Sequence, residues 1–140
     1  MKDEQTFENG NPERSTHKAE DSIDQNIQLE MDSALQNFSS QGLIDVFLEM
    51  LTAFRDEKEL RLLDIQNSLK TRDTQKLTRT LHSLRGSFLS LGIDSMASLL
   101  MELEQQALSP RPDWSLIEKR SIQLSLRYRI FEKICDHILH

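Results

Sequence analysis

Several residue types and patterns are scarce in this chain of 140 residues, and each scarcity excludes a class of protein. Cys135 is the single cysteine, so no internal disulfide can form, and a reducing, cytoplasmic environment is expected. No apolar run approaches the roughly 18 residues that are typical of a membrane span. The sequence therefore predicts a cytoplasmic protein that does not enter a membrane.

Proline and glycine are also rare. The chain has three prolines and four glycines, and no proline lies between Ser40 and Ser109. Proline in a helix interior removes a hydrogen bond and clashes with the preceding turn. Its absence from this central stretch favours long, uninterrupted helices.

Basic residues are outnumbered: 17 Lys and Arg stand against 23 Asp and Glu, for a net charge of −6. Residues 1–30 hold three Lys and Arg and eight Asp and Glu, so most of the negative charge lies in this N-terminal part. The rest of the chain is nearly neutral. Nucleic-acid binding needs a basic surface and is not expected. Residues 1–20 are expected to be a disordered acidic leader, followed by one helical domain at residues 21–140.

Apolar residues recur at steps of three and four in five segments, which predicts helices near 21–38, 43–70, 74–91, 94–107 and 114–135. No segment shows the alternation of a strand. The expected N-terminal caps are Asp21 or Ser22, Asp73 or Thr74, Asp94 or Ser95, and Asp113. The predicted fold is all-α, an antiparallel four-helix bundle with an additional N-terminal helix.

The segment 77–91 places a histidine on the solvent-facing side of its predicted helix. At 100° per residue, five apolar residues fall within about 40° of Leu77, whereas His82 falls about 140° away. This stripe consists of Leu77, Leu81, Leu84, Phe88 and Leu91. Gly86 follows one turn later on the same side, although a glycine inside a helix costs roughly 0.5–1 kcal/mol relative to alanine. Arg85 adds a nearby cation. The imidazole is expected to be exposed, with unobstructed access for a second molecule and a positive charge nearby. These features suit a histidine that accepts and passes on a phosphoryl group.

The stretch Leu81-His82-Ser83-Leu84-Arg85-Gly86-Ser87-Phe88-Leu89-Ser90-Leu91-Gly92, with Leu103-Glu104 after it, resembles the signature of histidine-containing phosphotransfer (HPt) domains. That family has a leucine two residues after the histidine, a cation three after it, then a glycine and a small residue. A second glycine and a leucine-acidic or leucine-amide pair follow. Arg85 stands where lysine is commoner in the family. Arginine keeps the positive charge but presents a planar guanidinium group in place of an ammonium group. The resemblance covers about two-thirds of the chain.

The resemblance implies a helical bundle that shuttles phosphoryl groups between aspartates of response-regulator receiver domains in phosphorelays. It implies that His82 is the phosphoacceptor, that Arg85 stabilises phosphate charge and that Gly86 leaves room for the partner. Glu104 matches the position that can orient the imidazole, although an ordinary surface glutamate is an equal alternative. The expected partners are receiver domains, a hybrid sensor kinase or both, and the protein is expected to be a monomer.

Three further residues are candidates for partner contact. Arg79 lies about one turn before His82 and could attract an acidic receiver surface, while Leu89 is expected to be exposed beside the site. Ser83, directly after His82, is the third candidate for contact with a partner. No metal site or cofactor is expected in the chain itself, and Mg²⁺ is expected on the partner receiver domain.

Two other classes remain as alternatives. A sensor-kinase dimerisation domain also carries a histidine on a helix, but there an acidic residue usually follows the histidine. Here Ser83 follows, and the sequence has no glycine-rich nucleotide box, so autokinase activity is not expected. A helical adaptor could instead bind or sequester a receiver domain without turnover, with His82 incidental.

Overall fold

The computed structural model describes the backbone of residues 12–140 and the side chains of residues 25–140. Five helices account for almost all of this part: α2 (Pro12–Ser40), α3 (Ile44–Thr71), α4 (Thr74–Leu91), α5 (Asp94–Leu108) and α6 (Trp114–Leu139). No strand occurs within the described residues. The prediction of an all-α fold is confirmed.

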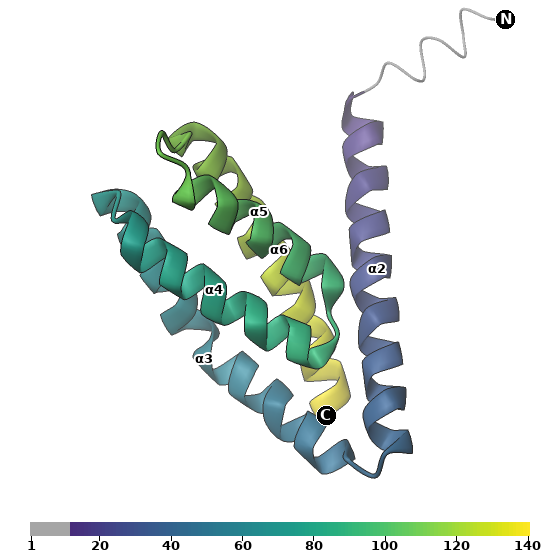
Figure 1. Ribbon diagram of the computed structural model, residues 1–140. Helices are drawn as coiled ribbons and strands as arrows, with labels where there is room; N and C mark the ends of the chain where they lie inside the picture. The colour runs from purple at the N-terminus through teal and green to yellow at the C-terminus, as the bar shows by residue number, and fades with distance from the viewer. Residues whose placement is uncertain (1–11) are drawn as a thin grey trace, which may run out of the picture.

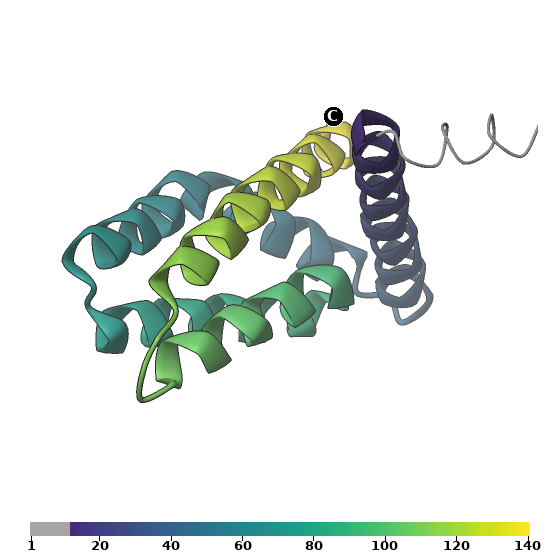
Figure 2. The same ribbon diagram turned by 90° about the horizontal axis from the view of Figure 1, so that it is seen from above.

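Helices α3 to α6 form an antiparallel four-helix bundle. Short turns join them in order, and α4 packs against both α3 and α5, while α6 closes the bundle against α5 and α3. Seen from above, α3 and α6 form one layer and α4 and α5 the other (Figure 2). Helix α2 packs across α3, α5 and α6 at one end of the bundle. The arrangement is the predicted bundle with an additional N-terminal helix.

The turns and caps follow local sequence signals. The Asp73 side chain accepts a hydrogen bond from the Lys76 backbone N–H at 3.1 Å, and Asp113 accepts one from Leu116 at 3.1 Å. These are the expected N-terminal caps of α4 and α6. Gly92 ends α4 with a φ of 86°, a left-handed conformation that glycine adopts without steric cost. The boundaries of the histidine helix are therefore encoded locally.

The core lies under α4. All five predicted stripe residues of α4 are buried: Leu77, Leu81, Leu84, Phe88 and Leu91. Phe88 packs at the centre of an aromatic cluster, with ring centroids 4.7 Å from Phe54 of α3 and 5.0 Å from Phe131 of α6. Offset and edge-on aromatic contacts of this kind each add about 0.5–1.5 kcal/mol beyond burial. This cluster fixes the rotation of α4, and with it the face that α4 turns to solvent.

The predicted start of the first helix at Asp21 or Ser22 is wrong, because α2 begins at Pro12. Proline suits a first helical turn, since its fixed φ is helical and its missing N–H would have no partner there. The sequence analysis relied on apolar periodicity, which begins only at Ile23. Residues 1–11 of the expected leader lie outside the described residues, and the domain boundary at residue 20 stays a prediction.

The expected cap of α5 by Asp94 or Ser95 is also wrong. Ile93 occupies the cap position without a side-chain hydrogen bond, and Asp94 lies in the first turn. Glu30 of α2 takes over the capping role: its carboxylate accepts hydrogen bonds from the Ser95 backbone N–H at 3.1 Å and from Ser95 Oγ at 2.6 Å. A carboxylate is favourable at a helix N-terminus, where unpaired N–H groups and the helix dipole carry positive charge.

Replacing Glu30 by alanine should lower the free energy of unfolding by about 1–2 kcal/mol, because the first turn of α5 loses its acceptor and α2 loses its polar anchor. Urea unfolding followed by circular dichroism measures this change. Gln28→Ala is the matched control, since Gln28 makes only an exposed bond to Asp32 one turn away. Equal stability of the two variants would contradict the assignment.

Cys135 is fully buried in α6, and burial raises the pKa of its thiol to about 12. At pH 8 the thiolate fraction is then about a thousandfold below that of an ordinary cysteine. Native protein should therefore react with iodoacetamide far more slowly than urea-unfolded protein, as followed by mass spectrometry. Comparable labelling rates would show that the thiol is not buried in solution.

Among the described residues, no helix combines the length and the hydropathy needed to cross a bilayer.

Candidate functional site

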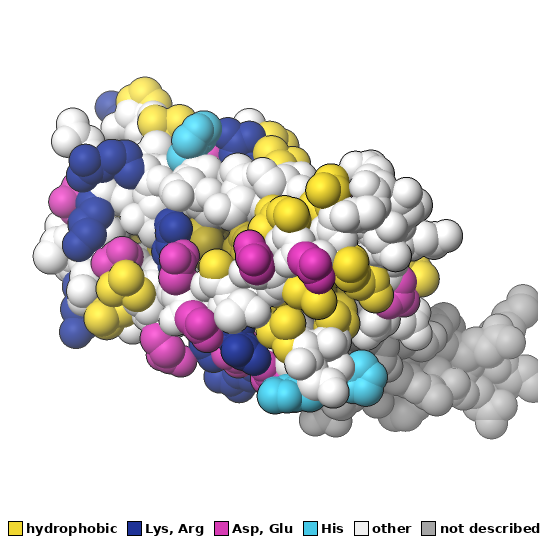
Figure 3. Space-filling view, turned by 90° about the horizontal axis from the view of Figure 1, so that it is seen from below, with side chains coloured by type: hydrophobic (Ala, Val, Ile, Leu, Met, Phe, Trp, Pro, Cys, Tyr) yellow, Lys and Arg dark blue, Asp and Glu magenta, His cyan; other side chains and the backbone are white. Residues whose placement is uncertain are grey.

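His82 stands on the solvent side of α4. Its side chain is 66% exposed, while Leu81 before it and Leu84 two residues after it are buried. The stripe that faces the core therefore turns the imidazole outward, as the helical spacing predicts. In the space-filling view of Figure 3, one histidine side chain stands clear of the surface with Lys and Arg side chains beside it.

Glu104 and Arg85 hold one edge of the imidazole. His82 Nδ1 lies 2.9 Å from Oε2 of Glu104, which α5 supplies. Arg85 Nε donates to the other carboxylate oxygen, Oε1, at 3.0 Å. The Glu104 side chain is only 12% exposed, so its charge acts in a partly dry setting where such contacts are stronger than in water. The structure thus brings together three of the sequence-predicted site residues from two helices.

The contacts at Nδ1 determine which ring nitrogen carries the proton. Arg85 Nη2 also lies 3.1 Å from His82 Nδ1, but one nitrogen cannot donate to Glu104 and accept from Arg85 at the same time. A carboxylate offers only lone pairs, so an unprotonated Nδ1 at 2.9 Å would be repelled by it. We therefore assign the proton to Nδ1, with Arg85 beside the ring as a neighbouring charge. The lone pair of the neutral ring is then on Nε2, which makes no hydrogen bond within the described residues.

Gly86 leaves the surface bare next to His82. It is exposed, and a Cβ built on it would meet no atom within 4 Å. Nothing in the described part of the chain therefore requires glycine here, although glycine destabilises a helix interior by roughly 0.5–1 kcal/mol. The absence of a side chain makes physical sense if a second molecule approaches the helix at this point.

The three candidate contact residues lie on α4, the helix that bears His82. Arg79 and Ser83 are exposed, and Leu89 is 51% exposed although it is a large apolar residue. Helix α4 carries Lys76, Arg79 and Arg85 and has no Asp or Glu, in a chain whose net charge is −6. The helix that bears the histidine is thus a local region of positive charge.

The sequence analysis missed Arg61 of α3. Its Nη1 donates to Ser83 Oγ at 3.0 Å, and its Nη2 lies 3.5 Å from Glu57 Oε2. Arg61 therefore brings a guanidinium from α3 to Ser83, the residue directly after His82. No sequence signal could have found it, because Arg61 and Ser83 are 22 residues apart and Arg61 stands among other charged residues of a long helix.

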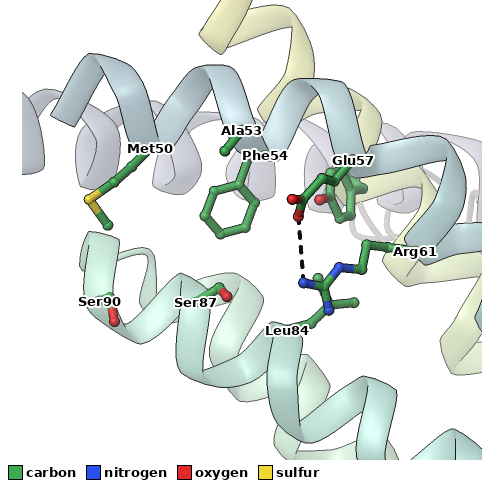
Figure 4. A pocket seen from close by; sticks show the side chains of 9 residues that line it. Met50, Ala53, Phe54, Glu57, Arg61, Leu84, Ser87 and Ser90 are labelled. Carbon is green, nitrogen blue, oxygen red and sulfur yellow. Dashed lines mark hydrogen bonds and ion pairs between the residues drawn. The ribbon is translucent and has the colours of Figure 1, made fainter. Parts of the chain in front are cut away.

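A pocket of about 220 Å³ opens between α3 and α4 next to this network (Figure 4). Met50 and Phe54 form its apolar wall, while Arg61 and Glu57 lie at one end. Tyr128 of α6 also lines it, and burial raises the pKa of its hydroxyl, which has no hydrogen-bond partner among the described residues. The surface between α3 and α4 is therefore hollowed and partly apolar next to Arg61.

No group of three or more His, Cys, Asp or Glu residues that could hold a metal ion occurs within residues 25–140. His137 and His140 lie at the C-terminal end of α6, and His17 precedes the residues whose side chains the structure describes.

A family model for the Hpt domain matches residues 49–133, a range that spans most of α3, all of α4 and α5, and most of α6. The chain belongs to the Hpt domain family. Hpt domains are phosphocarrier modules of phosphorelays that interact with receiver domains, and they are not kinases. Neither the comparison with curated proteins nor the comparison with solved structures gave a match. The resemblance stated from the histidine motif is thereby confirmed at the level of the family.

Proposed function

We propose that this Hpt domain accepts a phosphoryl group on Nε2 of His82 and exchanges it with an aspartate of a receiver domain. The observation that supports this proposal is the geometry of the ring. Nδ1 is engaged by Glu104 at 2.9 Å, whereas Nε2 points away from that contact on a side chain that is 66% exposed. A neutral imidazole nitrogen with a free lone pair is a good nucleophile, and the contact at Nδ1 leaves that lone pair on Nε2.

The transfer step is a displacement at phosphorus. Nε2 attacks the phosphorus of an aspartyl phosphate, an N–P bond forms, and the acyl P–O bond breaks to release the aspartate carboxylate. The ring keeps its proton on Nδ1 and becomes positively charged. Glu104 stabilises this charge through the Nδ1–H hydrogen bond, and the reverse transfer discharges the ring again.

Arg85 and Gly86 have separate roles in this proposal. Arg85 is anchored to Glu104 through Nε at 3.0 Å, which leaves its outer nitrogens next to the ring, where they can balance the charge of the incoming phosphoryl group. Gly86 lets the receiver's loops approach the helix backbone. The receiver supplies Mg²⁺ and its acidic pocket, which the cations of α4 complement. The buried, lone Cys135 fits the reducing cytoplasm that we propose as the location.

A transfer assay tests the proposal. Receiver domains from the source organism are charged on their aspartates with [³²P]acetyl phosphate and Mg²⁺, then mixed with the protein. We expect label to move to this chain within minutes for at least one receiver, in a form that acid removes and base does not. Tight binding of a receiver without any transfer would contradict the proposal and favour an adaptor that sequesters receivers.

Glu104→Gln should slow the transfer about tenfold. The amide oxygen can still accept the Nδ1–H hydrogen bond, but it carries no negative charge to stabilise the positive ring, and Arg85 loses its ionic partner. Rapid-quench measurement of the labelled protein gives the rate. Glu102→Gln is the control, because Glu102 lies on the same helix and is exposed. Equal rates for both variants would remove Glu104 from the mechanism.

A further inference from the structure

The outer surface of the α3–α6 layer carries four large, exposed apolar side chains. We call this surface the α3–α6 face and define it by Glu59, Leu60, Leu63, Gln66 and Lys70 of α3 with Glu118, Ile122, Ser125, Leu126 and Arg129 of α6. Leu60 and Ile122 are 61% and 64% exposed, and Leu63 and Leu126 are each 50% exposed. Clusters of exposed apolar residues mark interaction sites in folded proteins, whereas isolated ones are ordinary.

A groove runs along this face between the two helices. It has a volume of about 400 Å³ and is lined from α3 by Leu62, Ile65 and Leu69 and from α6 by Ser121 and Leu124. The hydroxyl of Ser121 is buried there, with no hydrogen-bond partner among the described residues. The groove is thus an apolar, hollowed surface rather than a row of isolated apolar side chains.

The two helices repeat the same order of side chains along this face. On α3, an acidic residue, an apolar residue, a polar residue and a cation follow at positions i, i+4, i+7 and i+11: Glu59, Leu63, Gln66 and Lys70. On α6 the same order and spacing are Glu118, Ile122, Ser125 and Arg129. Steps of four, three and four residues keep all members within about 40° of the first, on one side of each helix.

Because α3 and α6 are antiparallel, the repeat runs in opposite directions on the two helices. The ion pair between Lys58 Nζ and Glu132 Oε1 at 2.7 Å and the contact between Arg55 and Asp136 at 3.7 Å fix their register. Lys70 and Glu118 both line one end of the groove, so Glu59 and Arg129 lie toward the other. Each end of the face therefore carries one acidic and one basic residue, with the apolar residues between them.

We propose that the α3–α6 face is the interface of a homodimer in which a second copy of this chain packs face to face. A face with this charge order is complementary to itself. In a face-to-face dimer the two-fold axis lies in the plane of the interface. If the axis is perpendicular to the helices, Glu59 meets Lys70 of the second copy and Glu118 meets its Arg129. If the axis is parallel to the helices, Glu59 meets Arg129 of the second copy and Lys70 meets its Glu118. Opposite charges meet in both arrangements, and the apolar centres are buried against each other.

This dimer leaves both phosphotransfer sites available. Helix α4, which bears His82, lies in the other layer of the bundle (Figure 2). A homodimer would therefore present two exposed imidazoles on separate surfaces. The inference does not depend on the proposed role of His82, and it replaces the monomer that the family resemblance implies.

Light scattering coupled to size exclusion tests the proposal with the full chain, loaded at about 1 µM to about 1 mM. We expect the mass to rise from one chain to two across this range, as for a weak, small interface. Leu63→Glu should raise the dissociation constant at least about tenfold, because it places a charge in the apolar centre. A single-chain mass at every concentration would overturn the proposal.

Leu108→Glu is the matched control, since Leu108 is 64% exposed and lies at the end of α5, outside the face. It should leave the dissociation constant unchanged. If both variants weaken the dimer equally, the interface lies elsewhere. Circular dichroism checks folding. Lys70→Glu, at an exposed position of α3, provides a second disruption that does not alter the apolar surface.

Charge exchange identifies the arrangement. Lys70→Glu alone should weaken the dimer in either orientation. Adding Glu59→Lys restores it if the axis is perpendicular to the helices, and adding Glu118→Lys restores it if the axis is parallel. Failure of both double variants to restore the wild-type dissociation constant would contradict the charge complementarity on which the proposal rests.

Discussion

Replacing His82 by glutamine should abolish phosphoryl transfer and leave the fold intact. The side chain is 66% exposed and lies off the buried stripe of α4, so its loss removes no core contact. Glutamine keeps a polar side chain of similar length near Glu104 but has no nucleophilic ring nitrogen. We expect the free energy of unfolding to change by less than about 0.5 kcal/mol, as for ordinary surface substitutions, while label from a charged receiver falls below detection.

The control for this variant is His137→Gln, at an exposed position near the end of α6. It should accept label at the wild-type rate. Label that persists on His82→Gln would assign the phosphoacceptor to another residue. Loss of transfer together with a large loss of stability would mean that His82 contributes to the fold, contrary to its position in the structure.

The second large effect concerns Gly86. Gly86→Gln should reduce transfer about a hundredfold, because the new side chain occupies the bare surface that the receiver must approach one turn after His82. The effect should appear mainly as weaker binding of the receiver, which isothermal titration calorimetry measures directly. His82, Arg85 and Glu104 remain in place in this variant, so its chemistry should be normal once the receiver is bound.

Gly86→Ala separates the steric effect from the conformational one. A Cβ at this position meets nothing within 4 Å, so alanine should raise the free energy of unfolding by roughly 0.5–1 kcal/mol through its higher helix propensity. Its transfer rate should lie between those of wild type and Gly86→Gln. Wild-type transfer by the glutamine variant would show that Gly86 does not serve partner access.

The parts of the site that lie on one helix could be predicted from the sequence. Leu77 and Phe88 belong to a stripe with helical spacing, Asp73 and Gly92 bound the helix through local hydrogen bonds and backbone conformation, and together they determine that His82 faces water. Each of these signals extends over one or two turns.

The parts that depend on packing between helices could not be predicted. Arg61 reaches Ser83, and Glu30 caps α5 through Ser95, only because the bundle sets the rotation and the register of neighbouring helices. Glu104 is intermediate between these two groups. Its position in the sequence fits a glutamate that orients the imidazole and an ordinary surface glutamate equally well. Only the packing of α5 against α4 brings its carboxylate to Nδ1 of His82.

The central claim is that Nε2 of His82 is the nitrogen that bonds to phosphorus, because Nδ1 is held by Glu104. The most direct measurement is heteronuclear NMR of the ¹⁵N-histidine-labelled protein after phosphorylation by a charged receiver, with the ³¹P–¹⁵N coupling assigned to one ring nitrogen. The account predicts a single N–P bond, at Nε2 of His82. A bond at Nδ1, or at any other residue, would contradict it.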